Sequence, residues 1–394
     1  MSRVEGIVFA VIVGLCLCVP FGWQAIVALT PLETPEYSSI EKRDYEQFPE
    51  VSLFALADGT FQDSFEQFVA DSVPARDDVL FANARVQRAV IELSNLAFSF
   101  DCWPTYFGST RAYSKSHNVL FDIPRTTLKF TSEKLDKWTK KYTNMIEASP
   151  EVDWVFCLAD KDLSSKANPA YDLCASTADR DVISEGFLSR LPEECEVVGV
   201  TYEDTDAYYE KYYKNDYHWN IKGALEAYEE ISSALGIEPV ASEDDVFCVA
   251  HDQERLGSAL RIGLSKQVTK DDFFDVAYAE SELSVTVDGE EEDADWLVAY
   301  KNSDGGDADA DESKTYFHSN VGIITIHNED LDNGETLLII GDSFSNSIER
   351  LFAESYETVI SFDPRNNKTD LRVRDIIDLY DVDDAVFIMC QTSL

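Results

Sequence analysis

The chain has 394 residues, of which 45% are hydrophobic, so it can bury a large core as one large domain or two smaller ones. Its formal net charge is −43, and this charge lies beyond residue 30, because Arg3 and Glu5 are the only charged residues before that point. So acidic a body is unsuited to bind nucleic acid, anionic lipid or another polyanion. It fits a neutral or cationic ligand, or serves solubility alone.

The first 30 residues predict a membrane anchor. No charged residue interrupts the sequence from residue 7 to residue 29, which is long enough to span a bilayer as a helix. Arg3 precedes this stretch, and no cleavage site of small residues follows it. We therefore expect residues 1–30 to be a transmembrane signal anchor. The protein would then be a single-pass protein of the cell membrane with an extracytoplasmic body, and a cleaved signal peptide is the alternative.

Residues 31–95 predict a stalk and entry helices that leave the membrane. Phe61, Phe65 and Phe68 recur at helical spacing, so one amphipathic helix should end before Pro74. A second helix is expected from about residue 76 to residue 93.

From residue 96 to residue 394, short apolar runs alternate with helical patterns. Buried strands alternating with helices predict an α/β domain of stacked layers with a mainly parallel sheet. Asn220 is the expected N-cap of a helix over residues 221–235. The expected strands are 152–159, 195–200, 335–343 and the runs ETVISFD and DAVFIMC, and the other expected helices are FSNSIERLFAESY and LRVRDIIDLY.

An acidic insertion is expected to interrupt this alternation at about 241–320. Its segment 307–311, DADAD, lacks the glycine and the final glutamate of a calcium-binding loop, so we interpret it as a solvated surface loop and predict no metal site.

Six cysteines follow the expected anchor. An even number in an exported domain predicts disulfide bonds, and buried free thiols are the alternative. The six are Cys102, Cys157, Cys174, Cys195, Cys248 and Cys390.

Two short motifs predict a catalytic site. In IIGDSFSNS, an apolar strand runs into Gly341, Asp342 and Ser343 and then into a helix, so Ser343 should lie at the carboxyl end of the sheet, where open α/β sheets bind ligands. In NDYHWN, Asp216 and His218 stand just before a helix. A serine needs a base to take its proton, and a histidine held by a carboxylate is such a base. We therefore predict that Ser343, His218 and Asp216 converge.

These motifs resemble those of a known family. NDYHWNIKGALEAY is similar to the Asp-His-His-Trp motif of the DHHW proteins, and GDSFSNSIERL with VISFDPR resembles their serine block and the strand after it. Upstream, the segment from residue 38 onward resembles their entry segment, with Asp71, Pro74 and Arg76 in its Asp-x-x-Pro-x-Arg motif. Tyr217 replaces the first histidine of the signature.

DHHW proteins are similar to alginate O-acetyltransferases of the SGNH-hydrolase-like superfamily. The resemblance implies an SGNH-hydrolase-like three-layer domain that needs no cofactor, with Ser343 as the nucleophile, His218 as the base and Asp216 as its orienter. It also implies an O-acetyltransferase that modifies a cell-envelope or exported polysaccharide, with a membrane-bound O-acyltransferase as the acetyl supplier. A carbohydrate esterase and a non-catalytic glycan-binding assembly protein are the alternatives.

Three further residues are candidates for substrate binding. Arg365 follows the strand after the serine block and should contact substrate or pair with a nearby aspartate. Trp219 should either stack on a sugar or pack under the histidine loop. Asn346, like Asn320, is a candidate for the oxyanion hole, beside the backbone N–H groups of the helix after Ser343.

Overall fold

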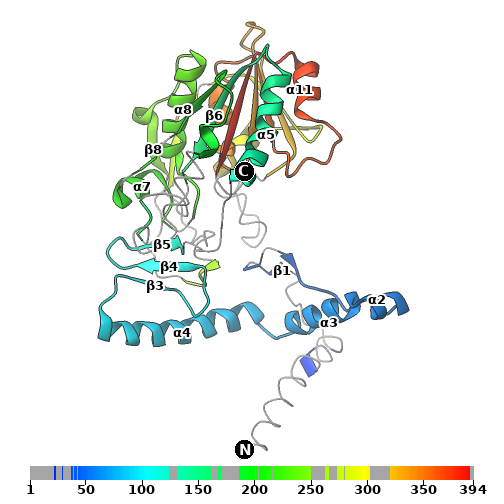
Figure 1. Ribbon diagram of the computed structural model, residues 1–394, viewed down its shortest axis with the longest axis vertical. Coiled ribbons are helices and arrows are strands. Elements are labelled where there is room, and N and C mark those ends of the chain that lie inside the picture. Colours follow the sequence, from blue (N-terminus) through cyan, green and yellow to red (C-terminus); the bar gives the residue numbers. More distant parts are fainter. Residues whose placement is uncertain are drawn as a thin grey trace, which may run out of the picture. The chain divides into compact units, whose positions relative to one another are not determined.

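The structure is a computed structural model in which the chain forms two compact units. One consists of Met1–Phe98 and Thr105–Phe107, and the other of Ser99–Pro104 and Gly108–Leu394. We call them the N-terminal unit and the sheet unit (Figure 1). The structure describes residues 22–23, 29, 37–38, 40–41, 43–123, 132–160, 167–169, 186–199, 201–202, 204–214, 216–249, 262–265, 273–278, 280–301 and 320–390.

The described part of the N-terminal unit from residue 37 onward is a short hairpin followed by three helices. Ser52 caps the first helix by accepting a hydrogen bond from the Ala55 N–H, and Gly59, with a φ of 92°, ends that helix and starts the next. The two helices predicted around Pro74 are confirmed, and the second extends to Phe98. The elements are β1 (Tyr37–Ser38), β2 (Arg43–Asp44), α2 (Leu53–Asp58), α3 (Thr60–Asp71) and α4 (Arg76–Phe98).

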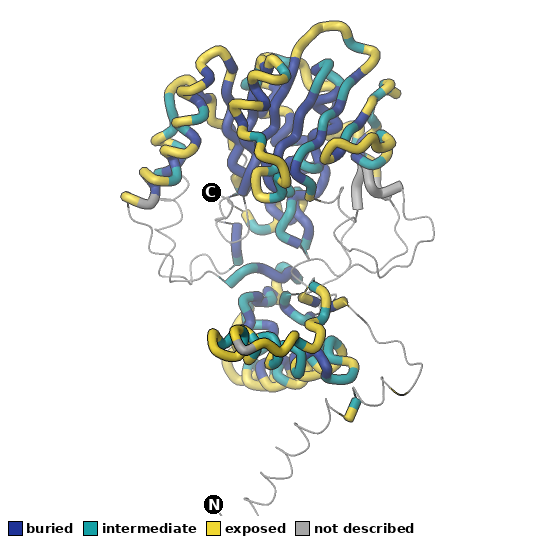
Figure 2. The backbone as a smooth tube through the Cα atoms, turned by 90° about the vertical axis from the view of Figure 1, so that its right-hand side faces the viewer, coloured by how far each residue is buried: buried dark blue, intermediate teal, exposed yellow. Residues whose placement is uncertain are grey.

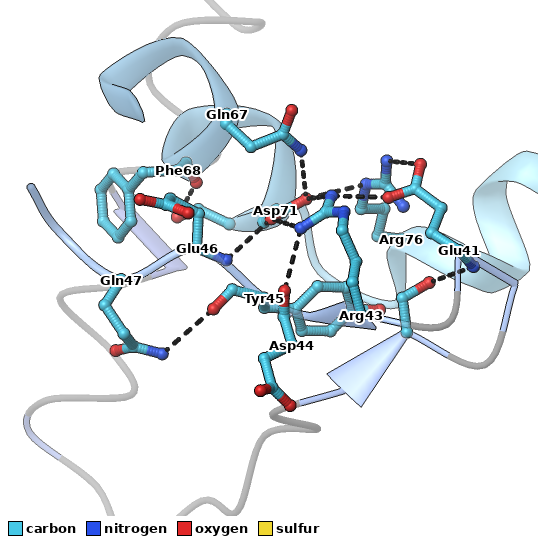
Figure 3. Close-up of polar contacts among 12 residues, drawn as sticks. Glu41, Arg43, Asp44, Tyr45, Glu46, Gln47, Gln67, Phe68, Asp71 and Arg76 are labelled. Atoms are coloured by element: carbon cyan, nitrogen blue, oxygen red, sulfur yellow. Dashed lines mark hydrogen bonds and ion pairs between the residues drawn. The ribbon is translucent and has the colours of Figure 1, made fainter. Parts of the chain in front are cut away.

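A buried carboxylate ties this hairpin to the helices. Asp71, at the end of α3, accepts hydrogen bonds from two Arg43 nitrogens at 2.7 and 2.8 Å and from the Glu46 N–H at 2.9 Å (Figure 3). Arg76, at the start of α4, lies 3.4 Å from Asp71 and 2.7 Å from Glu41. Burial opposes ionisation of Asp71, but the hydrogen bonds from Arg43 and the Glu46 N–H outweigh it and lower the pKa of Asp71.

The sheet unit is built on an eight-stranded sheet of order β11-β10-β12-β14-β13-β15-β6-β7. The strands from β14 to β7 pair in parallel, and β12, β10 and β11 add antiparallel pairs at one edge. This mixed α/β unit with a mostly parallel sheet agrees with the layered α/β domain that the sequence predicts. The strands are β6 (Asp153–Ala159), β7 (Cys195–Val198), β10 (Leu283–Val287), β11 (Glu290–Glu292), β12 (Ile323–Asn328), β13 (Thr336–Gly341), β14 (Thr358–Phe362) and β15 (Asp384–Cys390).

Helices cover both faces of this sheet. Alternate residues of β6, β13 and β15 enter two separate hydrophobic cores, because successive side chains of a strand point to opposite faces. α8 (Ile221–Leu235) packs in the first core, and α5 (Ser132–Ala148) and α11 (Val373–Tyr380) pack in the second (Figure 1). The central strands are buried along most of their length (Figure 2). Helix, sheet and helix therefore form three layers.

Smaller elements complete the sheet unit. A three-stranded antiparallel sheet contributes Ala112, Val119 and Phe121 to the first core. The remaining elements are β3 (Cys102–Pro104), β4 (Arg111–Ser114), β5 (Val119–Asp122), α7 (Thr205–Lys211), β8 (Val246–Val249), β9 (Phe273–Val276), the 3₁₀ helices η2 (Glu243–Asp245), η3 (Ala294–Lys301) and η5 (Ser345–Ser347), and α10 (Glu349–Phe352).

Two expectations differ from the observed structure. Within the segment assigned to the acidic insertion, β10 and β11 pair with the main sheet, and Val285 and Val287 of β10 are buried. The helix expected after Ser343 is a 3₁₀ turn followed by one short helical turn, η5 and α10. The segment 307–311 lies outside the described residues.

The expected membrane anchor, residues 1–30, lies outside the described residues except for positions 22, 23 and 29. Within the described ranges, no helix combines the length and the apolar character that crossing a bilayer requires.

Four of the six cysteines form no disulfide bond, which is the alternative to the expected pairing. They are Cys102, Cys157, Cys195 and Cys390. Burial raises the pKa of Cys102 to about 11 and the pKa values of Cys157 and Cys195 to about 12. These three thiols therefore stay protonated, and inert as nucleophiles, at neutral pH. Cys174 and the side chain of Cys248 lie outside the described part of the chain.

Candidate active site

Ser343 stands on a tight turn at the carboxyl end of the central strand β13. Gly341 ends the strand, and an added Cβ there would come within 2.6 Å of the Ser345 Oγ and 3.0 Å of the Ile388 carbonyl oxygen. Only glycine therefore fits where β13 passes β15 and turns. Ser343 itself is half-buried, whereas its neighbours Asp342 and Phe344 are buried.

The Asp342 carboxylate fixes the shape of this turn. It accepts a hydrogen bond from the Phe344 N–H at 3.0 Å and another from the Cys390 N–H, at the end of β15, at 2.9 Å. The Asp342 backbone accepts the Ser345 N–H at 2.9 Å. The turn that presents Ser343 is thus bound both to itself and to the neighbouring strand.

A second buried carboxylate supports the turn from α10. Glu349, 1% exposed, accepts hydrogen bonds from the hydroxyl groups of Ser345 at 3.0 Å and Ser361 at 2.5 Å. Ser361 belongs to β14, so this network joins the turn to the strand on the other side of β13. Both neighbours of β13 therefore hold the segment that carries Ser343.

The histidine lies on a closed loop between α7 and α8. The Tyr213 N–H donates to the His218 carbonyl at 3.2 Å, and the Asn220 N–H donates to the Lys211 carbonyl at 2.8 Å. Asn220 then caps α8 by accepting from the N–H groups of Lys222 and Gly223, as the sequence predicts. The loop is therefore bound at its base and continues directly into a helix of the main core.

Asp216, His218 and Ser343 form one chain of hydrogen bonds. The His218 Nδ1 lies 2.6 Å from the Asp216 Oδ1, and the His218 Nε2 lies 2.7 Å from the Ser343 Oγ. The His218 N–H also donates to the same Asp216 oxygen at 3.1 Å. The predicted convergence of the three residues is present.

The order of donors along this chain follows from the carboxylate. An ionised Asp216 only accepts, so the His218 Nδ1 must carry the proton and donate it. The Nε2 is then free to accept the hydrogen bond from the Ser343 hydroxyl, which is the orientation that a general base requires. The Asp216 side chain is 5% exposed and the His218 side chain 19%, so the base is reachable from solvent while its orienter is not.

Trp219 packs beneath the histidine loop and does not present its ring to a sugar. It is 2% exposed, its ring meets the Phe344 ring edge-to-face at 5.1 Å, and its Nε1 donates to the Ser347 Oγ at 2.8 Å. The expectation that it binds substrate is therefore wrong, and the alternative of packing is correct. Its hydrogen bond couples the histidine loop to the turn that follows Ser343.

Arg365 is paired with a local aspartate. Its Nε and a terminal nitrogen donate to the two carboxylate oxygens of Asp363 at 2.9 and 2.7 Å, and these hydrogen bonds to Asp363 raise the pKa of Arg365. The arginine side chain is 45% exposed. Asn346 is half-buried, and its side chain donates to the Asn320 side chain at 3.2 Å.

The first two backbone N–H groups after Ser343 are occupied. The Phe344 N–H donates to the Asp342 side chain and the Ser345 N–H to the Asp342 carbonyl. These two groups therefore do not supply the oxyanion hole that the sequence places at this helix start. A role of Asn346 or Asn320 in the oxyanion hole stays a prediction.

The sequence interpretation missed the residues that support the site. The Tyr217 ring packs against the His218 ring with 4.2 Å between ring centroids and an angle of 33° between the ring planes, and burial raises the pKa of Tyr217 well above its ordinary value. Ser347 and Glu349 were also unassigned. The run of serines in SFSNS was the available signal, because Ser345 and Ser347 are buried and a buried hydroxyl needs a hydrogen-bond partner.

Comparisons with known proteins reveal structural similarity alone. No family model matches the chain, and no curated protein sequence matches it. Among solved structures, Bacillus cereus PatB1 has a TM-score of 0.56 at 16% identity and covers 70% of this chain and 94% of its own. The same protein with a sulfonyl adduct gives a TM-score of 0.54 at 17% identity, covering 70% and 94%.

A DHHW family protein from Eubacterium siraeum has a TM-score of 0.53 at 16% identity, and the match covers 72% of this chain and 91% of that protein. The structure is thus similar to that of a DHHW protein, as the two motifs predict. At these identities the likeness establishes a shared fold.

Proposed function

We propose that this chain is a serine-dependent O-acyltransferase that passes an acetyl group to a hydroxyl group of a polysaccharide. The observation that carries the proposal is the hydrogen-bonded chain from Asp216 through His218 to Ser343 at the carboxyl end of the sheet. A serine whose proton is already shared with an oriented imidazole is activated for attack on a carbonyl carbon.

The reaction would proceed in two halves. The Ser343 Oγ attacks the acetyl carbonyl of the donor while His218 takes the serine proton, and the tetrahedral intermediate collapses to acetyl-serine. His218 returns its proton to the leaving alcohol or thiol of the donor. In the second half, His218 takes the proton of an acceptor hydroxyl, whose oxygen attacks the acetyl-serine carbonyl, and then returns that proton to Ser343.

Whether water or a sugar hydroxyl is the acceptor separates transfer from hydrolysis. The resemblance of the two motifs to DHHW proteins, and through them to alginate O-acetyltransferases, supports transfer, and the fold shared with a DHHW protein agrees with it. A carbohydrate esterase with the same three residues is the second candidate. The net charge of −43 favours a neutral or cationic acceptor over an anionic one.

The location and the acetyl supply are part of the same proposal. An uncharged stretch at residues 7–29 would hold the enzyme in the cell membrane, with the sheet unit outside the cytoplasm. A membrane-bound O-acyltransferase would then deliver acetyl groups from the cytoplasmic side. No nucleic acid partner and no cofactor are required.

A covalent probe tests the first half-reaction. Because the Bacillus cereus neighbour has been solved with a sulfonyl adduct, an alkyl or aryl sulfonyl fluoride is a suitable reagent for this fold. Intact-mass and peptide mass spectrometry should find one adduct on Ser343 of the purified chain. Ser343→Ala should abolish both the adduct and the turnover of an activated acetyl ester. The matched control is Ser189→Ala, an exposed serine of the same unit, which should leave both unchanged.

The acceptor is identified in a second experiment. The chain is incubated with the acetyl ester and a panel of neutral and cationic oligosaccharides, and mass spectrometry counts acetylated sugar against free acetate. Transfer to at least one glycan supports the transferase. If no glycan gains an acetyl group while acetylated glycans are stripped, the esterase takes its place. If Ser343→Ala changes nothing, both enzymatic functions fail and the non-catalytic assembly protein remains.

A further inference from the structure

Helix α4 carries an exposed apolar face in addition to its buried one. On its buried side, Ala84, Arg88 and Ile91 lie inward, and the Arg88 Nε donates to the Thr105 carbonyl at 3.3 Å. On the opposite side, Val79, Val86, Leu93 and Leu96 are 51%, 66%, 69% and 80% exposed. A surface helix normally buries one apolar stripe and shows a polar one to water, so a second apolar stripe needs a partner.

The spacing of this face is that of a coiled-coil seam. Val79, Val86 and Leu93 are seven residues apart, and Ala82, Ala89 and Leu96 each follow one of them by three. Ala82 and Ala89 are exposed as well. This is the a and d pattern of consecutive heptads, which places all six side chains on one seam. We call these six residues the α4 seam.

The charge of α4 suits pairing with an identical helix. The chain has a net charge of −43, so most surfaces of two copies repel each other. Within Arg76–Phe98, three arginines balance two aspartates and one glutamate, and the α4 seam itself has no charge. This helix is therefore a place where a second copy can approach without electrostatic penalty.

The sizes of the seam residues select an antiparallel pair. In a parallel pair, each residue meets its own counterpart, so alanine would face alanine at two levels and leave gaps. In an antiparallel pair, an a residue meets a d residue. With Val86 opposite Ala89 of the second copy, Val79 faces Leu96 and Ala82 faces Leu93, which sets larger side chains against smaller ones in four of the six layers.

The flanking charges fit the same register. Arg85 and Glu92 each precede an a residue, which is the g position beside the seam. In the antiparallel register above, Arg85 of one copy lies beside Glu92 of the other, and symmetry repeats the pair. In a parallel pair, Arg85 would lie beside Val90 and Glu92 beside Ala97, which leaves both charges without an opposite charge across the interface.

From the seam, its charge balance and its register, we propose that the α4 seam binds the α4 seam of a second copy of this chain in an antiparallel, two-fold symmetric coiled coil. A two-fold interface uses the same patch on both copies, as this one does. The proposal is independent of the chemistry at Ser343.

The mass of the full chain tests the proposal. Purified in mild detergent and corrected for bound detergent, wild-type protein should sediment at twice the chain mass of 44.3 kDa. Leu93→Glu, which sets two carboxylates into the seam, should give the single chain mass. The matched control is Leu379→Glu, because Leu379 on α11 is 65% exposed but belongs to no seam, and it should stay dimeric. Circular dichroism and melting curves verify that each variant is folded.

A charge exchange tests the register. Arg85→Glu places two carboxylates side by side at both symmetry-related Arg85–Glu92 positions, so the dissociation constant of the dimer should rise roughly tenfold, which is about 1.4 kcal/mol. The double variant with Arg85→Glu and Glu92→Arg restores opposite charges across the antiparallel interface and should recover most of the affinity. A parallel pair would show no recovery.

Three results would overturn the proposal. The first is a monomeric wild-type chain, in which another segment of the chain or a membrane protein would cover the seam. The second is a dimer that survives Leu93→Glu. The third is failure of the double variant to recover, which would remove the antiparallel register.

Discussion

Asp71 and Asp216 are buried to nearly the same extent, 9% and 8% exposed, but their carboxylates have different partners. Asp71, in the N-terminal unit, is held by Arg43, Arg76 and a backbone N–H, and so binds a hairpin to two helices. Asp216, in the sheet unit, accepts from the imidazole and the backbone N–H of His218, and the far nitrogen of that imidazole faces Ser343. One carboxylate joins segments of chain, and the other orients a base.

The two units also differ in how much hydrophobic surface they bury. The sheet unit has a hydrophobic core on each face of its sheet, and Leu338, Ile339 and Phe387 are completely buried. In the described part of the N-terminal unit, the buried hydrophobic residues are Ile40, Ala84 and Ile91, while many larger ones are exposed. Hydrophobic burial therefore fixes the geometry of the candidate site, and ion pairs hold the N-terminal unit, which leaves apolar surface for a partner.

The largest expected effect is on the orienting carboxylate. Asp216→Asn should slow formation of acetyl-serine by about 10³ to 10⁴-fold, because an amide can also hold His218 in the tautomer whose Nε2 carries the proton and cannot accept one from Ser343. The melting temperature should change little, since asparagine keeps the shape of the side chain. Stopped-flow measurement of acylation by an activated acetyl ester determines the rate. A loss of less than tenfold would contradict the assigned role.

The matching change in the N-terminal unit should affect stability and spare the chemistry. Asp71→Asn removes the charge that Arg43 and Arg76 face, and we expect a cost of about 2 kcal/mol, between the values for exposed and for buried ion pairs, because the Arg43 side chain is 32% exposed. Hydrogen exchange of the amides from residue 43 to residue 47 should accelerate, while acylation of Ser343 stays at the wild-type rate.

Asp63→Asn is the control for this change, because Asp63 is an exposed residue in the first turn of the same helix. It should leave exchange in the hairpin almost unaltered. Equal effects of the two substitutions would show that the ion-pair network does not hold the unit.

Acid should loosen the N-terminal unit before it unfolds the sheet unit. The pKa of Asp71 is lower in the folded protein than its ordinary value, so the unfolded chain binds a proton more readily than the folded one. The stability from Asp71 is then complete above about pH 5 and declines as the pH falls through the ordinary aspartate range toward the folded pKa. Hydrogen exchange between pH 6 and pH 3 should show this loss at residues 43–47 first, and Asp71→Asn should remove that pH dependence.

The sequence predicts the central strands because strands buried on both faces consist of continuous apolar runs. The runs at 335–343 and DAVFIMC contain β13 and β15, which lie at the centre of the sheet. The antiparallel strands on the β11 side of the sheet are harder to predict. β11 consists of three glutamates, so its own residues do not differ from a loop pattern, whereas β12 alternates buried and half-buried residues, which is a strand pattern that was not assigned. Their pairing depends on the neighbouring strand, which local patterns do not contain.

The same limit applies to the site. Ser343 and the pair Asp216 and His218 are recognisable because each motif marks the junction of a strand or loop with a helix. The hydrogen bonds that support these residues are not recognisable in the sequence. Trp219 and Ser347, for example, are 128 positions apart and meet only in the folded chain. α5 is absent from the predicted helices although its sequence does carry the signal. Its apolar positions, among them Leu135, Trp138 and Tyr142, recur at helical spacing.

The smallest expected effect tests the corrected role of Trp219. Trp219→Phe keeps an aromatic ring against Phe344 but removes the hydrogen bond to the Ser347 Oγ, which should cost about 1 kcal/mol of stability. Because this bond joins the histidine loop to the turn after Ser343, acylation should slow by roughly three- to tenfold, within the range that small misplacements of a catalytic group produce. The effect should be the same with and without a glycan present.

The variant Ser347→Ala removes the other partner of this hydrogen bond. The double variant should therefore be little worse than either single one, with a coupling of about 1 kcal/mol. A sugar-stacking tryptophan would behave differently. Its loss would leave acylation unchanged, raise the KM for the glycan acceptor and show no coupling to Ser347. Such a result would return Trp219 to the substrate-binding residues and would show that the buried ring moves outward when the acceptor binds.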